Sequence, residues 1–195
     1  MSTNSKYYEE HANDFIEGTI NCDMSVQYNF FEKYLNKDSK RIMDLGFGSG
    51  RDSLYFKTKG YIVTSIDPTK EFCVKAKELG LNDIRCITAQ EIDYNNEFDG
   101  IWACASLLHV PTKELNDVFN RCYKSLKKNG IMYCSFKYGN FEGIRRERFF
   151  VDLNEELLKE YIKNTGFIIK EFLITKDVRP DREESWLNVI LKKGK

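Results

Sequence analysis

Long apolar runs are missing from this sequence of 195 residues. A membrane-spanning helix needs about 20 consecutive apolar residues, and no window of the sequence approaches that length. The first ten residues are polar and carry none of the apolar core that marks a secretory signal. We therefore expect a cytoplasmic protein with no membrane partner.

An excess of charge of either sign is also missing, because 30 basic residues balance 30 acidic ones. This balance implies no global attraction to nucleic acid or to an anionic membrane and favours a small or neutral partner. The six cysteines are scattered and include no C-x-x-C pair. They support neither a zinc site nor a disulfide framework, so we expect no metal and no nucleic-acid partner.

Apolar material sufficient for one sizeable core is present, since 42% of the residues are hydrophobic. Apolar runs bounded by turn residues alternate with segments of helical spacing. The expected strands are 41–45, 61–66, 84–87, 98–105, 131–136, 167–175 and 186–192. No helix joins the last two, so they should pair antiparallel. The sequence thus predicts an α/β fold with a doubly wound, Rossmann-like sheet of seven mostly parallel strands and an antiparallel C-terminal hairpin.

Two regions outside this pattern are harder to assign. Residues 1–38 have helical spacing, with one helix expected over 6–20 ahead of a turn at Gly18, and we interpret them as a helical lid over a main domain at 39–195. Residues 137–150 show no convincing period and are expected to form a loop. The two parts together should make one structural domain.

The most informative stretch runs from Ile42 to Ser53, where a short apolar run ends in Asp44 and passes into glycines at positions 46, 48 and 50. Glycine has no side chain to keep a ligand away and adopts backbone angles that other residues resist. The stretch therefore predicts a strand, a tight nucleotide-binding turn and a helix. In a doubly wound sheet the ligand lies beyond the carboxyl ends of the strands. The residues just past the next strands are Asp67, Gln90, Glu91 and the segment from Cys104 to His109.

The glycine spacing argues against a dinucleotide. A G-x-G-x-x-G fingerprint would need its third glycine at position 51, which is Arg51, so an NAD-dependent oxidoreductase is disfavoured. Asp67 follows Asp44 by 23 residues, close to the roughly 20-residue interval at which an acidic side chain binds a ribose diol. A carboxylate two residues before the first glycine suits a ligand with an ammonium and a sulfonium better than a pyrophosphate.

On these residues the chain resembles a class I S-adenosylmethionine-dependent methyltransferase, by motif from Ile42 to Phe136 and elsewhere by the order of its elements. The resemblance implies S-adenosylmethionine as cofactor. It assigns the methionine portion to Asp44 and the turn residues Gly46, Phe47, Gly48 and Gly50, the ribose to Asp67, the adenine edge to Gln90 and Glu91, and the amino group to the backbone near Cys104.

Two of these positions depart from the usual pattern of the family. Phe47 stands where members often have Cys or Ala, and we expect its ring to crowd or stack on the ligand. Gln90 stands where many members have Asp. Residues 98–110 and the Gly-Ser-Gly-Arg-Asp-Ser turn are similar to small bacterial tellurite-resistance or thiopurine-like methyltransferases.

Base methylation is disfavoured by two absences. The Asn/Asp-Pro-Pro-Tyr signature of amino-directed methylases does not follow the fourth strand, and the Pro-Cys nucleophile of cytosine methylation does not occur. The resemblance therefore implies methyl transfer to a small-molecule acceptor by in-line displacement. The alternative is a non-catalytic protein that binds the same cofactor and regulates a partner.

In-line transfer requires alignment of the acceptor and exclusion of water. His109 is the best-placed base for an oxygen or nitrogen acceptor, and the alternative is a histidine that orders the loop before Pro111. Tyr8 is a second candidate, because it could close over the cofactor and the acceptor, although aromatic residues at helical spacing are more often core.

Arginines cluster in two segments, 145–150 and 179–182, which are expected to border the substrate side of the sheet. Arginine forks bind carboxylates and other oxyanions in bidentate fashion. We therefore predict an anionic acceptor held by Arg145, Arg146 and Arg179, against the alternative of charged loops that only face solvent. The sequence indicates neither the identity of the acceptor nor the oligomeric state.

Overall fold

A mixed sheet of seven strands forms the centre of the molecule in the computed structural model, which describes residues 3–179 and 182–194. The strand order is β3-β2-β1-β4-β5-β9-β8. The strands are β1 (Arg41–Leu45), β2 (Ile62–Ile66), β3 (Asp83–Arg85), β4 (Phe98–Ala103), β5 (Leu126–Lys137), β8 (Phe167–Lys176) and β9 (Ser185–Lys193). The first five run parallel, and β9 is antiparallel to both β5 and β8. This confirms the predicted sheet and its C-terminal hairpin.

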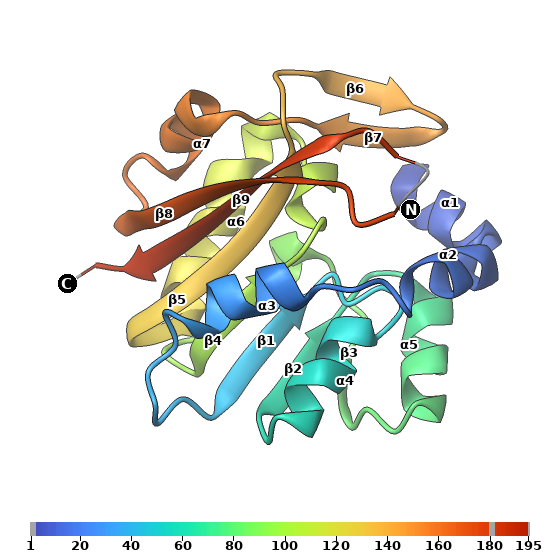
Figure 1. Cartoon of the computed structure of the whole chain (residues 1–195), viewed down its shortest axis with the longest axis horizontal. Coiled ribbons are helices and arrows are strands. Elements are labelled where there is room, and N and C mark those ends of the chain that lie inside the picture. Colours follow the sequence, from blue (N-terminus) through green and yellow to red (C-terminus); the bar gives the residue numbers. More distant parts are fainter. Residues whose placement is uncertain (1–2, 180–181, 195) are drawn as a thin grey trace.

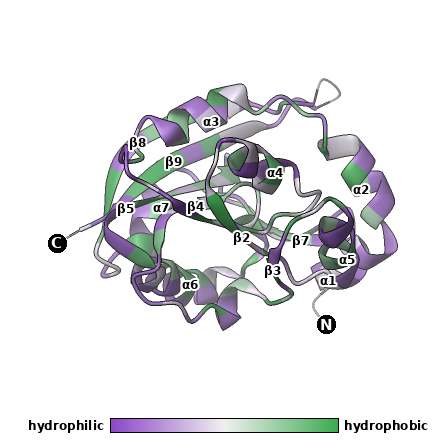
Figure 2. Ribbon diagram, turned by 90° about the horizontal axis from the view of Figure 1, so that it is seen from below, coloured by the Kyte–Doolittle hydropathy of each residue, from purple (hydrophilic) through white to green (hydrophobic). Residues whose placement is uncertain are grey.

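Helices cover both faces of the sheet (Figure 1). They are α1 (Thr3–Glu10), α2 (Ala12–Thr19), α3 (Ser25–Glu32), α4 (Arg51–Thr58), α5 (Lys70–Glu78), α6 (Thr112–Ser125) and α7 (Glu155–Ile162). Helices α3 and α4 lie on one face of the sheet and α6 lies on the other. The helices carry both hydrophilic and hydrophobic residues, as amphipathic helices between core and solvent do (Figure 2). None of the helices in the described residues combines the length and the apolar character that a membrane span requires.

Two hydrophobic clusters, one on each face, follow from the alternation of side chains along the central strands. In β4, Ile101 belongs to the cluster under α6, whereas Trp102 belongs to the cluster under α3 and α4. In β5, Met132 and Tyr133 divide in the same way. All four side chains are fully buried, and burial of each contributes about 1.5–3 kcal/mol. The two clusters hold the carboxyl ends of β1, β4 and β5 at one edge.

The segment at 137–150 does not form the predicted loop. It contains a two-stranded sheet, β6 (Glu142–Arg145) and β7 (Arg148–Val151), joined by a two-residue turn. Both turn residues, Arg146 and Glu147, have positive φ, +47° and +64°. Such turns usually carry Asn-Gly or Asp-Gly, so an Arg-Glu pair gave no hairpin signal.

The N-terminal segment also differs from the prediction of one helix ending at a turn. The backbone at His11 leaves helical geometry with φ −121° and ψ 24°, so α1 and α2 are separate, and Gly18 lies inside α2. The ring of His11 stacks on Tyr7 with centroids 4.4 Å apart, and its Nδ1 lies 2.9 Å from the Tyr7 carbonyl oxygen. These local contacts stabilise the break.

Candidate functional site

The glycine turn joins β1 to α4 at the carboxyl edge of the sheet. All three glycines have positive φ, +80° at Gly46, +50° at Gly48 and +82° at Gly50, which side chains disfavour. The Gly46 amide donates to the carbonyl of Ile66 at the end of β2, 2.7 Å away. The turn is thereby tied to the neighbouring strand.

Neighbouring side chains pack closely over this turn. A Cβ atom at Gly46 would lie 2.5 Å from Ser106 Cβ, and one at Gly48 would lie 2.9 Å from the ring of Phe15. Glycine is therefore required at both positions for close packing as well as for φ. A ligand at this turn would therefore meet Phe15 of α2 as well as the glycine backbone.

Asp44 lies beneath the turn. It is 1% exposed and accepts a hydrogen bond from Ser53 Oγ at 2.6 Å. Burial, and next the nearby charge of Asp52, raise the pKa of Asp44 well above its usual range. Two cavities, described below, lie at this edge of the sheet, and the described residues that line them do not include Asp44.

Asp67 follows β2 and reaches back to the glycine turn. Its carboxylate accepts hydrogen bonds from the backbone amides of Gly48, at 3.1 Å, and Thr69, at 2.9 Å. Burial raises its pKa, while these two bonds oppose the rise. A carboxylate offers about four lone-pair sites, so roughly two remain for a ligand such as a diol. Asp67 thus caps the local backbone and still lines a cavity.

Two cavities meet at the turn. The first, with about 1490 Å³ of empty space partly open to solvent, lies beside β2 and β3 and is lined by Asp67, Thr88 and Gln90. The second, with about 990 Å³, lies beside β5 and β9. Both are lined by Tyr8, Phe15, Gly46, Gly48, Ala105 and His109. A ligand longer than either cavity could therefore cross the turn.

Gln90 and Glu91 are both predicted to contact the adenine edge, but their side chains have different partners in the structure. Gln90 lines the first cavity, and its amide donates to Glu114 at 2.8 Å. Glu91 accepts bonds from the backbone amide and the hydroxyl of Thr88, at 2.8 and 2.7 Å, in a capping box. These bonds lower the pKa of Glu91. Its side chain is thus used to cap the short turn at 89–91.

Tyr8, His109 and Arg148 form a hydrogen-bonded chain between the cavities. His109 Nδ1 lies 2.8 Å from the Phe149 carbonyl oxygen, which can only accept, so this nitrogen carries the proton. Nε2 is then free to accept from the Tyr8 hydroxyl at 2.9 Å. That hydroxyl accepts in turn from Arg148 Nη1 at 3.2 Å. Burial lowers the pKa of His109 to about 4 and raises that of Tyr8, so both are neutral near pH 7.

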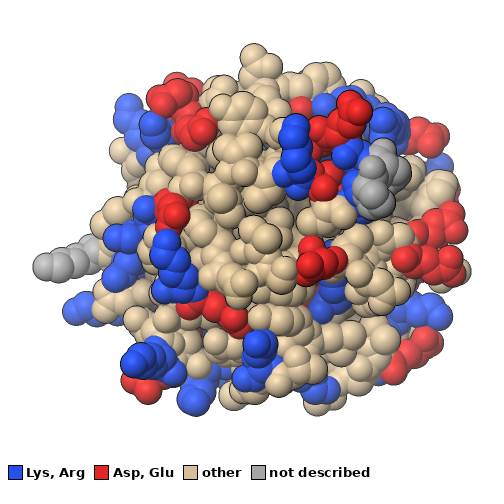
Figure 3. All heavy atoms as spheres, in the orientation of Figure 1, with Lys and Arg blue, Asp and Glu red and all other residues tan. Residues whose placement is uncertain are grey.

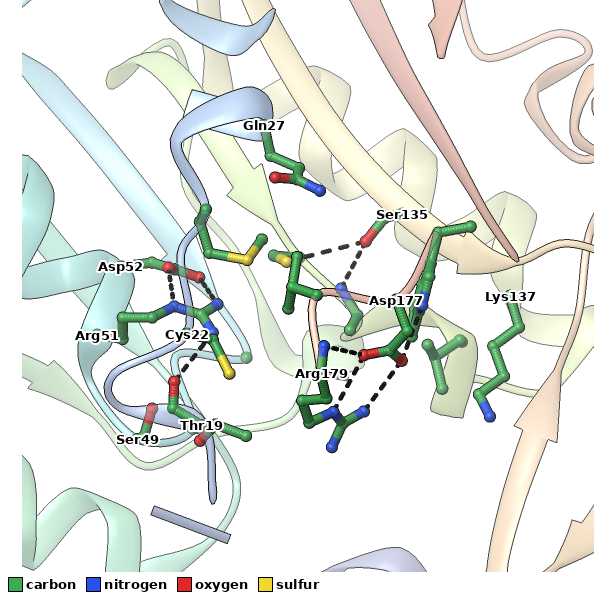
Figure 4. A pocket seen from close by; sticks show the side chains of 18 of the residues that line it. Thr19, Cys22, Gln27, Ser49, Arg51, Asp52, Ser135, Lys137, Asp177 and Arg179 are labelled. Carbon is green, nitrogen blue, oxygen red and sulfur yellow. Dashed lines mark hydrogen bonds and ion pairs between the residues drawn. The ribbon is translucent and has the colours of Figure 1, made fainter. Parts of the chain in front are cut away.

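Cys104 and Ser135 also line the second cavity, and Figure 4 shows Ser135 there. Ser135 Oγ accepts a hydrogen bond from the amide of Ala105 at 2.8 Å, and Ala105 has φ +50°. Burial raises the pKa of the Cys104 thiol to about 12. The thiol is therefore protonated near neutral pH and is a poor nucleophile.

Basic side chains concentrate in the lining of the second cavity. Among the described residues they are Arg51, Lys137, Arg148, Lys176, Arg179 and Arg182, against the acidic Asp52 and Asp177. Over the face drawn in Figure 3, by contrast, coloured basic and acidic side chains are interspersed. The described lining of the second cavity thus has more basic than acidic side chains, unlike the face drawn in Figure 3.

Three of these cations already have acidic partners. Arg51 donates two bonds to Asp52, at 2.7 and 2.9 Å, and Arg179 pairs with Asp177 at 3.2 Å (Figure 4). Lys137 Nζ lies 2.7 Å from an oxygen of Glu184. These pairs mostly cancel the charges involved.

The predicted arginine set is only partly brought together. Arg179 lines the second cavity. Arg145 instead pairs with Asp152, and Arg146 is exposed in the turn of the β6–β7 hairpin. The described lining of either cavity includes neither of these two. Arg148 lines the second cavity from β7, whereas Arg146 lies in the turn between the two strands, where its positive φ takes it out of the strand geometry.

Comparison with known proteins indicates the kind of enzyme. Residues 43–134 match the family model described as a methyltransferase domain, a span that includes the glycine turn, Asp67 and His109. The protein is a methyltransferase by this domain match, and its fold is that of S-adenosylmethionine-dependent methyltransferases of solved structure. The domain match thus covers the strands that carry the site of this methyltransferase. The finer resemblance to tellurite-resistance or thiopurine-like enzymes stays a prediction.

Individual relatives agree with this assignment. An uncharacterized methyltransferase of Staphylococcus carnosus is 27% identical over 162 residues, 78% of each chain. Phosphoethanolamine N-methyltransferase of Plasmodium falciparum is 29% identical over 69% of this methyltransferase, which spans only about half (49%) of that relative. The structure of a Burkholderia thailandensis 1,6-didemethyltoxoflavin-N1-methyltransferase superposes with a TM-score of 0.80 at 19% identity, covering 99% of this chain and 88% of that one.

Three side chains at the site were not among the predicted site residues. Gln27, Arg148 and Asp177 all line the second cavity. Arg148 stands in the predicted arginine-rich segment and could have been found by recognising the hairpin. Gln27 and Asp177 have no local signal, because only the packing of α3 and the β8–β9 connection brings them to the cavity.

Proposed function

We propose that this methyltransferase transfers a methyl group from S-adenosylmethionine to a small-molecule acceptor that occupies the cavity beside β5 and β9. The observation that carries the proposal is the meeting of two cavities at the glycine turn, with His109 and Tyr8 lining both. The cofactor supplies the electrophilic methyl group. An adenosine on one side of the turn and an acceptor on the other would bring the reacting atoms together there.

The residues present fit this cofactor. Asp67 has lone pairs left for the ribose hydroxyls, and Gln90 lies in the same cavity for the adenine edge. The methionine portion would pass Gly46 and Gly48 toward the backbone near Cys104. Asp44, Gly50 and Glu91 would support this arrangement indirectly. Asp44 accepts a bond from the Ser53 hydroxyl on α4, Gly50 precedes α4 with positive φ, and Glu91 caps the turn at 89–91.

The capacity of Tyr8 and His109 to accept a proton limits which acceptors can be methylated at this site. If Tyr8 accepted a proton from the acceptor, its own proton could pass to His109 Nε2, so the proton balance closes within the pair. A pKa of about 4 makes the resulting imidazolium unfavourable. The pair therefore suits acceptors that attack without a strong base, such as a neutral amine or a thiolate, and its main contribution is to position the acceptor and exclude water.

The similarities support a small-molecule acceptor. The names of the Plasmodium falciparum and Burkholderia thailandensis relatives refer to small-molecule substrates, whereas the comparisons give no support to a non-catalytic role. The basic lining of the second cavity favours an anionic acceptor. We further propose a cytoplasmic location and a lid role for residues 1–38.

Transfer can be tested with methyl-labelled S-adenosylmethionine and a panel of small amines, thiols and carboxylates. The expected result is labelled product and S-adenosylhomocysteine with at least one acceptor. Cofactor binding without turnover against the whole panel would instead favour the non-catalytic alternative. Failure of both S-adenosylmethionine and S-adenosylhomocysteine to bind in calorimetry would refute the proposal.

A further inference from the structure

Gln27 is the feature of the second cavity that the proposed function does not use. It lies on α3, is 5% exposed and lines the cavity, where its amide points into the space between Asp52 and Ser135 (Figure 4). Its Oε1 is buried without a hydrogen-bond partner. Buried amide oxygens are nearly always paired, so an unpaired one at a ligand cavity indicates a partner that arrives with the ligand.

The neighbouring polar groups cannot readily provide that partner. Both carboxylate oxygens of Asp52 are engaged, by Arg51, Trp102 and Tyr28, and carboxylate oxygens only accept. The Tyr133 hydroxyl donates to Asn188 at 2.6 Å. Neither Asp52 nor Tyr133 therefore donates a hydrogen bond to Gln27 Oε1.

Arg148 carries the complementary unpaired group. Its Nε is buried without a partner, although Nη1 donates to Tyr8. Within the described residues no ion pair neutralises Arg148, in contrast to Arg51, Lys137 and Arg179. Its guanidinium lies 4.7 Å from the ring centroid of Tyr7 and 5.1 Å from that of Phe150, which restricts its movement. It is therefore a preorganised anion-binding group.

We propose that the acceptor is an anion that also carries a separate N–H or O–H donor, and that Gln27 determines specificity by accepting from this donor while Arg148 binds the anionic group. This inference rests on the proposed function, because it concerns the acceptor of that reaction. Met24, Phe150 and Trp186 also line the cavity, so its walls suit a flat, partly apolar acceptor.

The chain offers a matched control for Gln27. Ser39 Oγ is likewise buried without a partner, and Ser39 is 7% exposed, but it does not belong to the described lining of the cavity. Removing either unpaired polar group should not destabilise the free protein. We expect Gln27→Leu to raise its Tm, by about 2–4 °C if the unpaired oxygen opposes folding by the amount of one hydrogen bond.

Ligand binding separates the two variants. The probes are benzoate, 3- and 4-hydroxybenzoate, and 3- and 4-aminobenzoate, titrated by calorimetry in the presence of saturating S-adenosylhomocysteine. The wild type should bind at least one hydroxy or amino compound about tenfold more tightly than benzoate. Gln27→Leu should lose this preference, Ser39→Ala should keep it, and Arg148→Met should weaken binding of every probe.

The outcomes distinguish this inference from the proposed function. If S-adenosylhomocysteine binds normally but no probe binds, or if Gln27→Leu keeps the wild-type preference, the inference is wrong while the proposed function stands. A fall in S-adenosylhomocysteine affinity on Gln27→Leu would also overturn it, because Gln27 would then contact the cofactor. If S-adenosylhomocysteine does not bind the wild type, the proposed function fails first.

Discussion

Replacement of Gly46 by alanine should destabilise the protein through two separable effects. A side chain at its φ of +80° costs about 1 kcal/mol in backbone strain. The new Cβ would also lie 2.5 Å from Ser106 Cβ, and overpacking of this kind typically costs about 1–3 kcal/mol. The expected total is about 2–4 kcal/mol. Displacement of Ser106 would also move the short turn Leu107–His109, because the His109 amide bonds to the Ser106 carbonyl at 3.1 Å.

Gly60 provides the control for strain alone. It has φ +89°, and a Cβ there would meet nothing within 4 Å, so Gly60→Ala should cost only about 1 kcal/mol. Urea unfolding of both variants measures the difference. The double variant Gly46→Ala with Ser106→Gly, compared with Ser106→Gly alone, should show only the strain. If Gly46→Ala is no less stable than Gly60→Ala, or if the double variant recovers nothing, the packing argument is refuted.

Three further predictions concern the cofactor, acid stability and the lid. Asp67→Asn should weaken S-adenosylhomocysteine binding in calorimetry by roughly 10- to 100-fold, as loss of a charged hydrogen bond does; an unchanged Kd would remove the ribose assignment. With its pKa near 4, His109 stays neutral in the folded protein, while the unfolded chain binds a proton below about pH 6.5. The free energy of unfolding should therefore fall as the pH decreases from 6.5 to 4. In urea titrations of His109→Gln, this fall in the free energy of unfolding should be smaller by up to roughly 3 kcal/mol. Asn4 exchanges two hydrogen bonds with the backbone of Phe149, at 3.0 and 2.7 Å, so Asn4→Ala should speed amide exchange in α1 while leaving α6 protected; equal exchange in α1 before and after the change would argue against this contact as the lid's anchor.

The parts of the fold that could be predicted depend on local patterns. The strands, the glycine turn and most helices have apolar periodicity with glycine or asparagine at their ends. Asn154 is an example, because asparagine is a preferred residue at a helix start and its side chain accepts from the Leu157 amide at 2.9 Å at the beginning of α7. The β6–β7 hairpin could not be predicted, because positive φ at Arg146 and Glu147 is imposed by pairing rather than by residue preference.

The candidate site likewise contains some residues that the sequence could predict and others that it could not. Asp67 was found by its interval from Asp44, and the structure places it in a cavity at the glycine turn. Motif reasoning assigns Asp44 and Glu91 to the ligand. The bond of Asp44 to Ser53 joins β1 to α4 and is not encoded in the motif, whereas the bond of Glu91 to Thr88 belongs to a Thr-x-x-Glu capping box that can be recognised in the sequence. The acceptor side was least predictable, since it is assembled from α3, β7 and the β8–β9 connection.

A crystal structure with S-adenosylhomocysteine bound tests the central claim most directly. We predict the ribose hydroxyls on Asp67, the adenine beside Gln90, and the sulfur at the glycine turn, facing the cavity that Gln27 and Arg148 line. Adenine in the cavity beside β5 and β9, or a sulfur directed away from that cavity, would contradict the proposed arrangement of cofactor and acceptor.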